Sequence, residues 1–287
     1  MAGANAAMAP AVPEQAEAPR QPASALTKRI ASAAVMLPLA LAAWWMGGAV
    51  FAMLAAFAAY FMLREWLRFP GEGPKSLHLT YFWMPLLLAL GSMADGRADW
   101  ALGLLAVFIV LLPVLQRQRP LWALAGAVYI GLPCLCLVWL RGHPGDGRLI
   151  VLWLLAVVWA TDTGAYIFGR VIGGPKLIPV LSPNKTWAGL GGGMLCAAVT
   201  GGAIALLGSA PGHELPWLLL ALFSALVAVV SQAGDFFESG VKRHFGVKDS
   251  GALIPGHGGA LDRLDGLLFA APFAALGMLL WGDKLWP

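Results

Sequence analysis

Apolar residues fill most of the chain and occur in nine long runs, separated by short polar or glycine- and proline-containing segments. The runs are residues 30–46, 49–63, 79–93, 100–115, 121–140, 149–168, 187–208, 217–234 and 266–281. A helix needs about 20 mostly apolar residues to cross the hydrocarbon core of a bilayer. The pattern therefore predicts an all-α, polytopic membrane helix bundle with about nine transmembrane helices. Only Gly47-Gly48 separates the first two runs, so these could instead form one re-entrant hairpin.

The overall composition excludes most other classes of protein. Of the 287 residues, 59% are hydrophobic and only 12% are charged, about half of the roughly 25% found in soluble domains. These values are incompatible with a soluble enzyme, a disordered chain or a coiled coil. A membrane β-barrel is also excluded, because its strands alternate apolar and polar residues and would dilute the hydrophobic average.

The distribution of basic residues predicts how the bundle is oriented. If the N-terminus is cytoplasmic, 15 of the 19 Lys and Arg residues fall in cytoplasmic segments, and the other four lie outside. Those four are Arg97, Arg141, Arg148 and Lys284. Because Lys and Arg collect on the cytoplasmic side, we expect a cytoplasmic N-terminus and an external C-terminus. The two longest polar segments, 169–186 and 235–265, then face the cytoplasm, and any chemistry should do so too.

The chain divides into three parts by composition. Residues 1–27 are rich in Ala, Pro, Gln and Glu without apolar periodicity, which predicts a flexible tail. Residues 28–158 contain the N-terminal transmembrane helices. Residues 159–287 contain further helices and nearly all unusual polar residues, and we expect them to form the catalytic region, with a motif loop at 235–266.

The segment 235–266 has the composition of a phosphate and metal site. It holds five acids, four fixed bases and six glycines that precede the acid at position 262. The acids are Asp235, Glu238, Asp249, Asp262 and Asp265, and the bases are Lys242, Arg243, Lys248 and Arg263. Carboxylates bind a hard cation such as Mg²⁺, whereas bases and glycine N–H groups suit phosphate oxygens. Two alternatives stay open: Asp265 as an acid favoured by a helix N-terminus, and Glu238 as a solvated interface acid.

Two further stretches before this segment carry candidate residues. Asp162 lies inside an apolar run, where an acid is a functional candidate by default; the alternative is a structural pairing with Arg170 or Arg263. Ser182-Pro-Asn-Lys-Thr186 precedes an apolar run, so its hydroxyls, amide and lysine could bind an anion at a helix N-terminus. The same residues also form an ordinary turn with a helix cap.

These motifs together resemble one known family. The run S-G-V-K-R-H-F-G-V-K-D-S-G-A-L-I-P-G-H-G-G-A-L-D-R-L-D, residues 239–265, is similar to the signature of phosphatidate cytidylyltransferases, also called CDP-diacylglycerol synthases. The D-T-G-A-Y stretch at 162–166 and the S-P-x-K-T pattern at 182–186 occur in the same order as in that family. Asn184, Ala188 and Gly266 depart from residues common in the family, which are Lys, Glu and Ser respectively.

The resemblance implies an enzyme that joins CTP and phosphatidate into CDP-diacylglycerol and releases pyrophosphate. It also implies an integral protein of a bacterial-type cytoplasmic (inner) membrane. It implies Mg²⁺ held by Asp235 and Asp262, with K⁺ as a candidate second ion. We expect catalytic roles for Asp235, Lys242, Asp262, Arg263 and Asp265. We expect substrate contacts from Asp162, Ser182, Asn184, Lys185, Thr186, Arg243, Lys248, Asp249, His257, Gly258 and Gly259. The expected partners are CTP, phosphatidate and the bilayer, with no nucleic acid, and a homodimer is left open.

Other functions fit the sequence less well. A transporter of anions should contain inverted repeats with paired broken helices, and the two halves lack self-similarity. A CDP-alcohol phosphotransferase should carry a D-G-x-x-A-R…G-x-x-x-D-x-x-x-D pattern, which is missing. The remaining alternatives are a related membrane nucleotidyltransferase acting on another lipid phosphate and an inactive lipid-binding relative.

Overall fold

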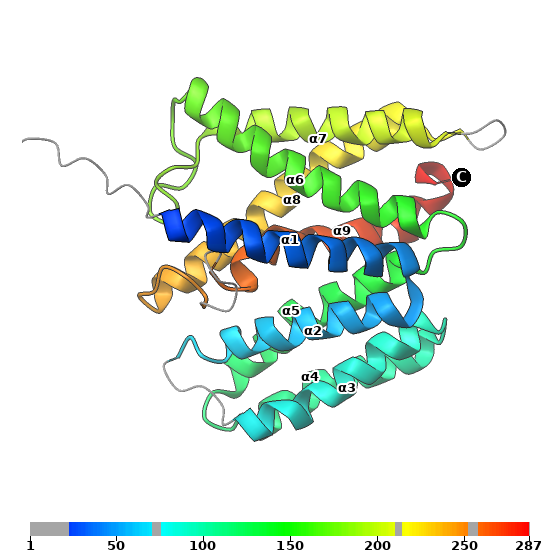
Figure 1. Cartoon of the computed structure of the whole chain (residues 1–287), viewed down its shortest axis with the longest axis vertical. Coiled ribbons are helices and arrows are strands. Elements are labelled where there is room, and N and C mark those ends of the chain that lie inside the picture. Colours follow the sequence, from blue (N-terminus) through cyan, green and yellow to red (C-terminus); the bar gives the residue numbers. More distant parts are fainter. Residues whose placement is uncertain (1–22, 71–75, 210–213, 252–257, 287) are drawn as a thin grey trace, which may run out of the picture.

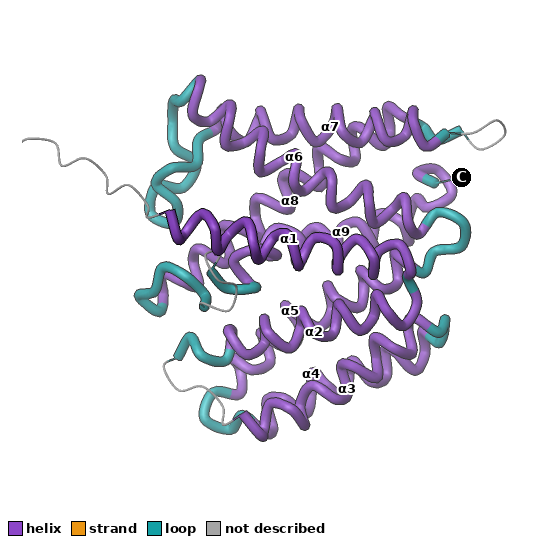
Figure 2. The backbone as a smooth tube through the Cα atoms, in the orientation of Figure 1, coloured by secondary structure: helices purple, strands orange, loops and turns teal. Residues whose placement is uncertain are grey.

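The computed structural model describes residues 23–70, 76–209, 214–251 and 258–286, and these residues form an all-α bundle (Figures 1 and 2). Its helices are α1 (Ala23–Met46), α2 (Gly48–Trp66), α3 (Ser76–Ala94), α4 (Ala98–Leu115), α5 (Pro120–Arg141), α6 (Gly147–Val171), α7 (Trp187–Gly208), α8 (Trp217–His244) and α9 (Leu261–Leu285). The predicted all-α class is therefore confirmed.

Seven of these helices are long and apolar enough to cross a membrane, namely α2 and α4 to α9. In α1 and α3 the apolar parts are shorter, Ala34–Met46 and Trp83–Ala94. The first two predicted runs form separate helices of 24 and 19 residues. The chain reverses between them at Gly47 and Gly48, whose φ angles of 66° and 50° lie in the left-handed region that favours glycine.

Two predicted boundaries need correction. Residues 235–266, expected as one loop, are helical at both ends, since α8 continues to His244 and α9 begins at Leu261. Helix α8 continues because its last turns are amphipathic, with one polar and one apolar face. It ends before Gly246, which has a φ of 67°. At the N-terminus, α1 begins at Ala23, inside the tail predicted for residues 1–27, and residues 1–22 lie outside the described part.

The chain runs from end to end of the bundle, so that the start of α1 and the C-terminal end of α9 lie at opposite ends (Figure 1). The ends of α2, α6 and α8 and the starts of α3, α7 and α9 all lie at the same end as the start of α1. The two motif-bearing segments of the sequence therefore share one end of the molecule.

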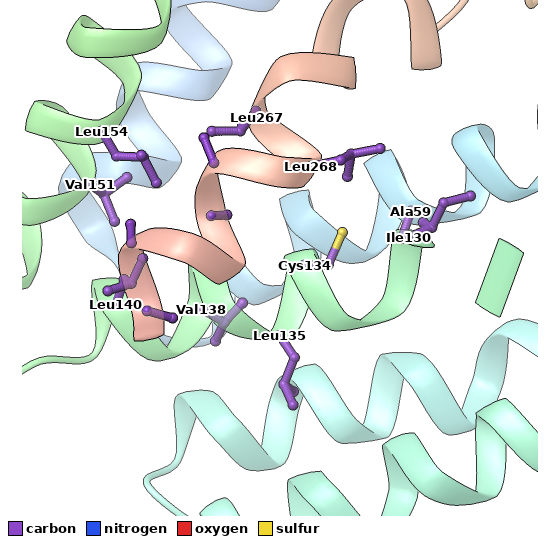
Figure 3. Packing of buried hydrophobic residues seen from close by; sticks show 14 of the residues in the cluster. Ala59, Ile130, Cys134, Leu135, Val138, Leu140, Val151, Leu154, Leu267 and Leu268 are labelled. Atoms are coloured by element: carbon purple, nitrogen blue, oxygen red, sulfur yellow. The ribbon is translucent and has the colours of Figure 1, made fainter. Parts of the chain in front are cut away.

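Helix α5 is the most buried of the seven candidate spans and joins two groups of helices. It packs against α2, α3 and α4 on one side and against α6 and α9 on the other. Figure 3 shows this junction, where Ile130, Cys134, Leu135, Val138 and Leu140 of α5 lie among apolar side chains of α2, α6 and α9. In contrast, the outward faces of the bundle carry many exposed large apolar residues, as expected of a surface that contacts lipid.

Glycines allow the closest helix contacts, and α7 offers a direct test of this. A Cβ at Gly192 would lie 2.3 Å from Phe168 Cβ on α6, whereas a Cβ at the neighbouring Gly191 would meet nothing within 4 Å. We expect Gly192→Ala to lower the free energy of unfolding by about 1–3 kcal/mol through overpacking. Gly191→Ala should be neutral or stabilising by up to about 1 kcal/mol, because alanine favours the helix.

Thermal unfolding of both variants in the same detergent tests this expectation. Equal melting temperatures for the two variants would contradict a close approach of α6 and α7 at Gly192.

Candidate active site

The ends of α6 and α8 and the starts of α7 and α9 lie at one end of the bundle (Figure 1), and polar side chains of these four helices contact one another or line a common cavity there. These four helices are sequential neighbours, since α6 packs on α7, α7 on α8 and α8 on α9. Helices α8 and α9 touch closely: a Cβ at Gly234 would lie 2.5 Å from the carbonyl oxygen of Asp265. This contact brings the acids at the end of α8 next to those at the start of α9.

The segment between α6 and α7 folds back on itself in a short antiparallel contact. Lys176 and Thr186 form an isolated β-bridge, and the Leu177 N–H donates to the Lys185 carbonyl oxygen at 3.0 Å. Thr186 is the N-cap of α7, and its Oγ1 accepts a hydrogen bond from the Gly189 N–H at 3.0 Å. The prediction that this segment opens a helix is confirmed, and the fold-back holds Lys185 beside α8.

A cavity of about 610 Å³ lies between α6, α7 and α8. Its lining consists of Asp162, Ala165, Tyr166, Gly169, Arg170, Lys176, Leu177, Asn184, Lys185, Thr186, Gly189, Leu190, Gln232 and Asp235. Lys185 forms an ion pair with Asp235 across the cavity, and its ammonium group lies 4.5 Å from the centre of the Phe236 ring. The cavity therefore offers anchored charges of both signs.

Asp262 is held by several hydrogen bonds at the start of α9. Its carboxylate accepts from the Ser250 N–H at 2.9 Å, the Ser250 hydroxyl at 2.8 Å and the Gly259 N–H at 2.9 Å. Lys242 of α8 donates to the same carboxylate at 2.8 Å and to Glu238 at 3.1 Å. Lys242 thus links an acid of α8 to an acid of α9.

The acids form a connected group. Asp265 interacts electrostatically with both Asp235 and Glu238, and Glu238 interacts in turn with Asp262. Glu238 is 1% exposed, and its Oε1 is buried without a hydrogen-bond partner. The alternative that Glu238 is a solvated interface acid is therefore wrong, because its side chain is enclosed between α8 and α9.

The donor set suits a hard divalent cation. Four carboxyl groups lie near two ammonium groups, those of Lys185 and Lys242. Oxygen ligands of this kind are those that Mg²⁺ prefers, and the unpartnered oxygen of Glu238 is one free ligand. In the described residues, no three His, Cys, Asp or Glu side chains are already arranged around one point. The residues therefore fit Mg²⁺ chemically, with their carboxylates drawn towards the lysines.

A second, apolar groove of about 480 Å³ lies on another face of α8. Its lining consists of Trp122, Leu181, Ala233, Phe236, Phe237, Gly240, Val241, His244, Phe245 and Phe269. Ala233 and Phe236 immediately flank Gly234 and Asp235 in the sequence. One helix therefore separates a polar cavity from an apolar groove.

The predicted site residues are distributed unevenly over this end. Asp162, Asn184, Lys185, Thr186 and Asp235 line the polar cavity. Asp262, Asp265, Lys242, Gly258 and Gly259 surround the start of α9. Arg243, Lys248, Asp249 and Arg263 are exposed at the helix ends, and Ser182 uses its N–H to bond Ile178. His257 lies outside the described residues.

Some residues at this end escaped sequence reasoning. Gln232, Lys176 and Arg170 line the cavity, and the first could have been found as a polar residue inside an apolar run. Arg170, which was one of two alternative partners for Asp162, donates to the Tyr166 hydroxyl at 2.7 Å. Glu65 of α2 contacts the start of α9, although it reads in the sequence as an interface charge beside an arginine.

Known proteins are similar to this chain over most of its length. A family model described as the cytidylyltransferase family matches residues 27–281. A phosphatidate cytidylyltransferase of Brucella melitensis biotype 1 is 42% identical over 252 residues, which cover 86% of this chain and 91% of the relative. Phosphatidate cytidylyltransferases of Brucella suis biovar 1 (40% over 251 residues, 86% and 91%) and Staphylococcus haemolyticus (36% over 250 residues, 83% and 92%) are also similar. The chain therefore belongs to the cytidylyltransferase family.

Proposed function

We propose that the chain is a membrane nucleotidyltransferase that transfers CMP from CTP to phosphatidate, a committed step of phospholipid biosynthesis. The products are CDP-diacylglycerol and pyrophosphate. The observation that carries this proposal is the polar cavity whose Lys185–Asp235 pair adjoins the acid cluster of α8 and α9. Membership of the family and full-length similarity to phosphatidate cytidylyltransferases support it.

The reaction needs charge neutralisation and alignment more than covalent help. A phosphate oxygen of phosphatidate attacks the α-phosphorus of CTP, and the bond to the β-phosphate oxygen breaks as pyrophosphate leaves. The attacking oxygen is already anionic, so the site need not supply a general base. The two reacting groups repel each other, so the enzyme must hold cations and N–H donors around them.

The residues divide into three roles in this proposal. Lys185, Asn184 and Thr186 border the cavity and bind the triphosphate, with Asp162 at its inner wall. Lys242 orients Asp262 and, together with Asp265 and Arg263, belongs to the catalytic group. The remaining proposed substrate contacts come from Ser182, Arg243, Lys248, Asp249, His257, Gly258 and Gly259.

Asp235 and Asp262 hold Mg²⁺ in this proposal, with K⁺ as a second ion. When bound, Mg²⁺ supplies positive charge to the triphosphate and orients it. The excess of carboxylates over lysines at this end supports the assignment. Asp265 and Glu238 lie beside the two ligands and supply further carboxyl oxygens.

The apolar groove beside Asp235 provides a place for an acyl chain of phosphatidate. Phe236, Phe237 and Phe269 line it, and it is separated from the polar cavity by α8 alone. A lipid phosphate at the helix end could then reach the cavity while its chain stays in apolar surroundings. This arrangement would let one site accept a nucleotide and a lipid.

We further propose that α1 to α9 all cross the bacterial cytoplasmic membrane, with the N-terminus and the active site on the cytoplasmic side. The bias of basic residues supports this orientation. The start of α1 and the C-terminal end of α9 lie at opposite ends of the bundle, which supports an odd number of crossings.

Purified protein should incorporate labelled CTP into lipid only when phosphatidate and Mg²⁺ are both present. EDTA should abolish the activity, and Asp262→Asn should lower kcat by about 100-fold or more, because a preorganised charge is removed from the site. Thin-layer separation of the labelled lipid measures the product. As a control, Asp99→Asn alters an exposed acid in the first turn of α4 and should leave kcat unchanged.

Each failure identifies a different error. Full activity of Asp262→Asn would refute the metal assignment. Incorporation into another lipid phosphate in place of phosphatidate would indicate the related nucleotidyltransferase, and lipid binding without turnover would indicate an inactive relative.

Removing the charge of Lys242 should reduce turnover even though its side chain is only partly buried. Lys242→Gln leaves Asp262 and Glu238 without their common cation, and the two carboxylates should then repel each other and turn apart. We expect kcat to fall about 10–100-fold. Lys284→Gln, which removes an exposed positive charge at the other end of α9, should retain the parent rate, and equal rates in the two variants would refute the role of Lys242.

The orientation can be measured by labelling single cysteines at the two ends of α4. Asp95 and Gln118 are exposed near opposite ends of this helix. In right-side-out vesicles, a membrane-impermeant maleimide should label Asp95→Cys but not Gln118→Cys, and inside-out vesicles should reverse the pattern. Labelling of Gln118→Cys in right-side-out vesicles would reverse the proposed orientation.

A further inference from the structure

Glu65 is a buried acid at the end of α2, far in the sequence from every motif residue. Its side chain is 4% exposed. The neighbouring Trp66 fixes this end of α2, because its indole stacks on Trp122 of α5 at 4.0 Å and each indole N–H donates to the other's carbonyl oxygen. Glu65 is therefore held on a rigid element and not on a mobile loop.

The carboxylate of Glu65 caps the start of α9 from outside. It accepts hydrogen bonds from the Ala260 N–H and the Leu261 N–H, both at 2.9 Å. Helix α9 begins at Leu261, and Ala260, as its N-cap, has no side chain that can serve the free N–H groups. Glu65 supplies these missing acceptors, and its negative charge faces the positive end of the helix dipole.

The same carboxylate is connected to Asp262. The Ser250 hydroxyl lies between them, at 3.2 Å from Glu65 Oε2 and 2.8 Å from Asp262 Oδ2. A hydroxyl has one proton, so it can donate to only one of these oxygens at a time. The next residue along α9 after the capped Leu261 N–H is Asp262 itself. Glu65 is therefore connected to Asp262 in two ways, through the Ser250 hydroxyl and through the first backbone N–H groups of α9.

Two glycines of the motif fit around Glu65. A Cβ at Gly251 would lie 2.8 Å from Glu65 Oε1, and a Cβ at Gly259 would lie 2.7 Å from Oε2 and 2.0 Å from Ser250 Oγ. No larger side chain can occupy either position without moving the carboxylate. The motif segment is thus shaped to receive an acid from the N-terminal half of the chain.

The geometry points to Glu65 as a positioning residue that fixes the Asp262 carboxylate for cation binding and turnover. This inference rests on the proposed role of Asp262. A cap that only stabilised α9 would contribute to folding alone. The positioning role instead requires that loss of Glu65 change the behaviour of the cation at Asp262 beyond any loss of stability.

The test compares full-length Glu65→Gln, Ser250→Ala and their double variant with the parent enzyme in one detergent. Glutamine keeps one acceptor oxygen but points N–H groups at the backbone N–H groups of α9, so the cap should break. Changes to residues that orient a metal ligand typically alter metal affinity or activity 10- to 100-fold. We therefore expect Glu65→Gln to lower kcat about 10- to 100-fold and to raise the Mg²⁺ concentration for half-maximal activity about 10-fold, with KM for CTP within about 2-fold.

Ser250→Ala should give a smaller change in the same direction, about 3- to 10-fold in the Mg²⁺ requirement. The double variant should resemble Glu65→Gln, because the two residues act along one connection. A second readout does not depend on turnover: the rise in melting temperature on adding Mg²⁺ should shrink in Glu65→Gln and vanish in Asp262→Asn.

Leu90→Ala is the matched control for stability, since Leu90 is fully buried in α3 and makes no polar contact with the motif. It should lower the melting temperature while kcat and the Mg²⁺ requirement stay at parent values. The inference is overturned if Glu65→Gln and Ser250→Ala behave as Leu90→Ala does. If Glu65→Gln does not fold, Ser250→Ala decides alone, and an unchanged Mg²⁺ requirement overturns the inference. Full activity of Asp262→Asn would overturn both this inference and the site assignment, whereas an inactive Asp262→Asn beside normal Glu65→Gln and Ser250→Ala would overturn only this inference.

Discussion

The compensation of buried carboxylates is the constraint on which this end of the molecule depends. A charged side chain at the centre of a bilayer costs about 2.5–3.5 kcal/mol even on insertion scales, and breaking a buried ion pair costs about 3–5 kcal/mol. Lys242 contacts both Glu238 and Asp262, and Lys185 contacts Asp235. The two pairings of Lys242 depend on the extension of α8 by ten residues past its apolar run, which carries Lys242 alongside α9. The length of α8 is thus coupled to the acids that it must compensate.

The N-terminal half of the bundle contributes to the site through α2 and not only as a membrane anchor. The Trp66–Trp122 stack joins α2 to α5, and α5 in turn packs on α9. A Cβ at Gly126 of α5 would lie 2.3 Å from Trp66 Cδ1, so the absence of a side chain there permits the stack. Hydrogen bonds cross the predicted division between the helices of residues 28–158 and the catalytic region 159–287, because Glu65 belongs to the first part and caps a helix of the second.

The sequence predicted what depends on local pattern and missed what depends on distant contacts. Apolar runs located all nine helices of the described residues, and the run 187–208 matches α7 in full. The length of the apolar run could not show that α8 continues to His244. The added turns are amphipathic and are stabilised as helix by packing on α9. Asp162, Lys185 and Asp235 were found as charges near apolar runs, and they do line one cavity. Glu65 was missed because its partners lie about 185 to 196 residues away.

The contacts of the motif glycines indicate a different role from the one that their composition suggests. Glycines beside bases first suggest backbone N–H groups that approach phosphate oxygens, yet the Gly259 N–H already donates to Asp262. Gly258 has a φ of 88°, a conformation that glycine adopts without strain, and a Cβ there would lie 3.2 Å from Asp262 Oδ2. These glycines therefore surround the protein's own carboxylates. The composition of this segment resembles that of a phosphate-binding loop, but its glycines pack around the carboxylates of Glu65 and Asp262. Its selectivity for a substrate must then come from the charged groups that these two acids hold in place.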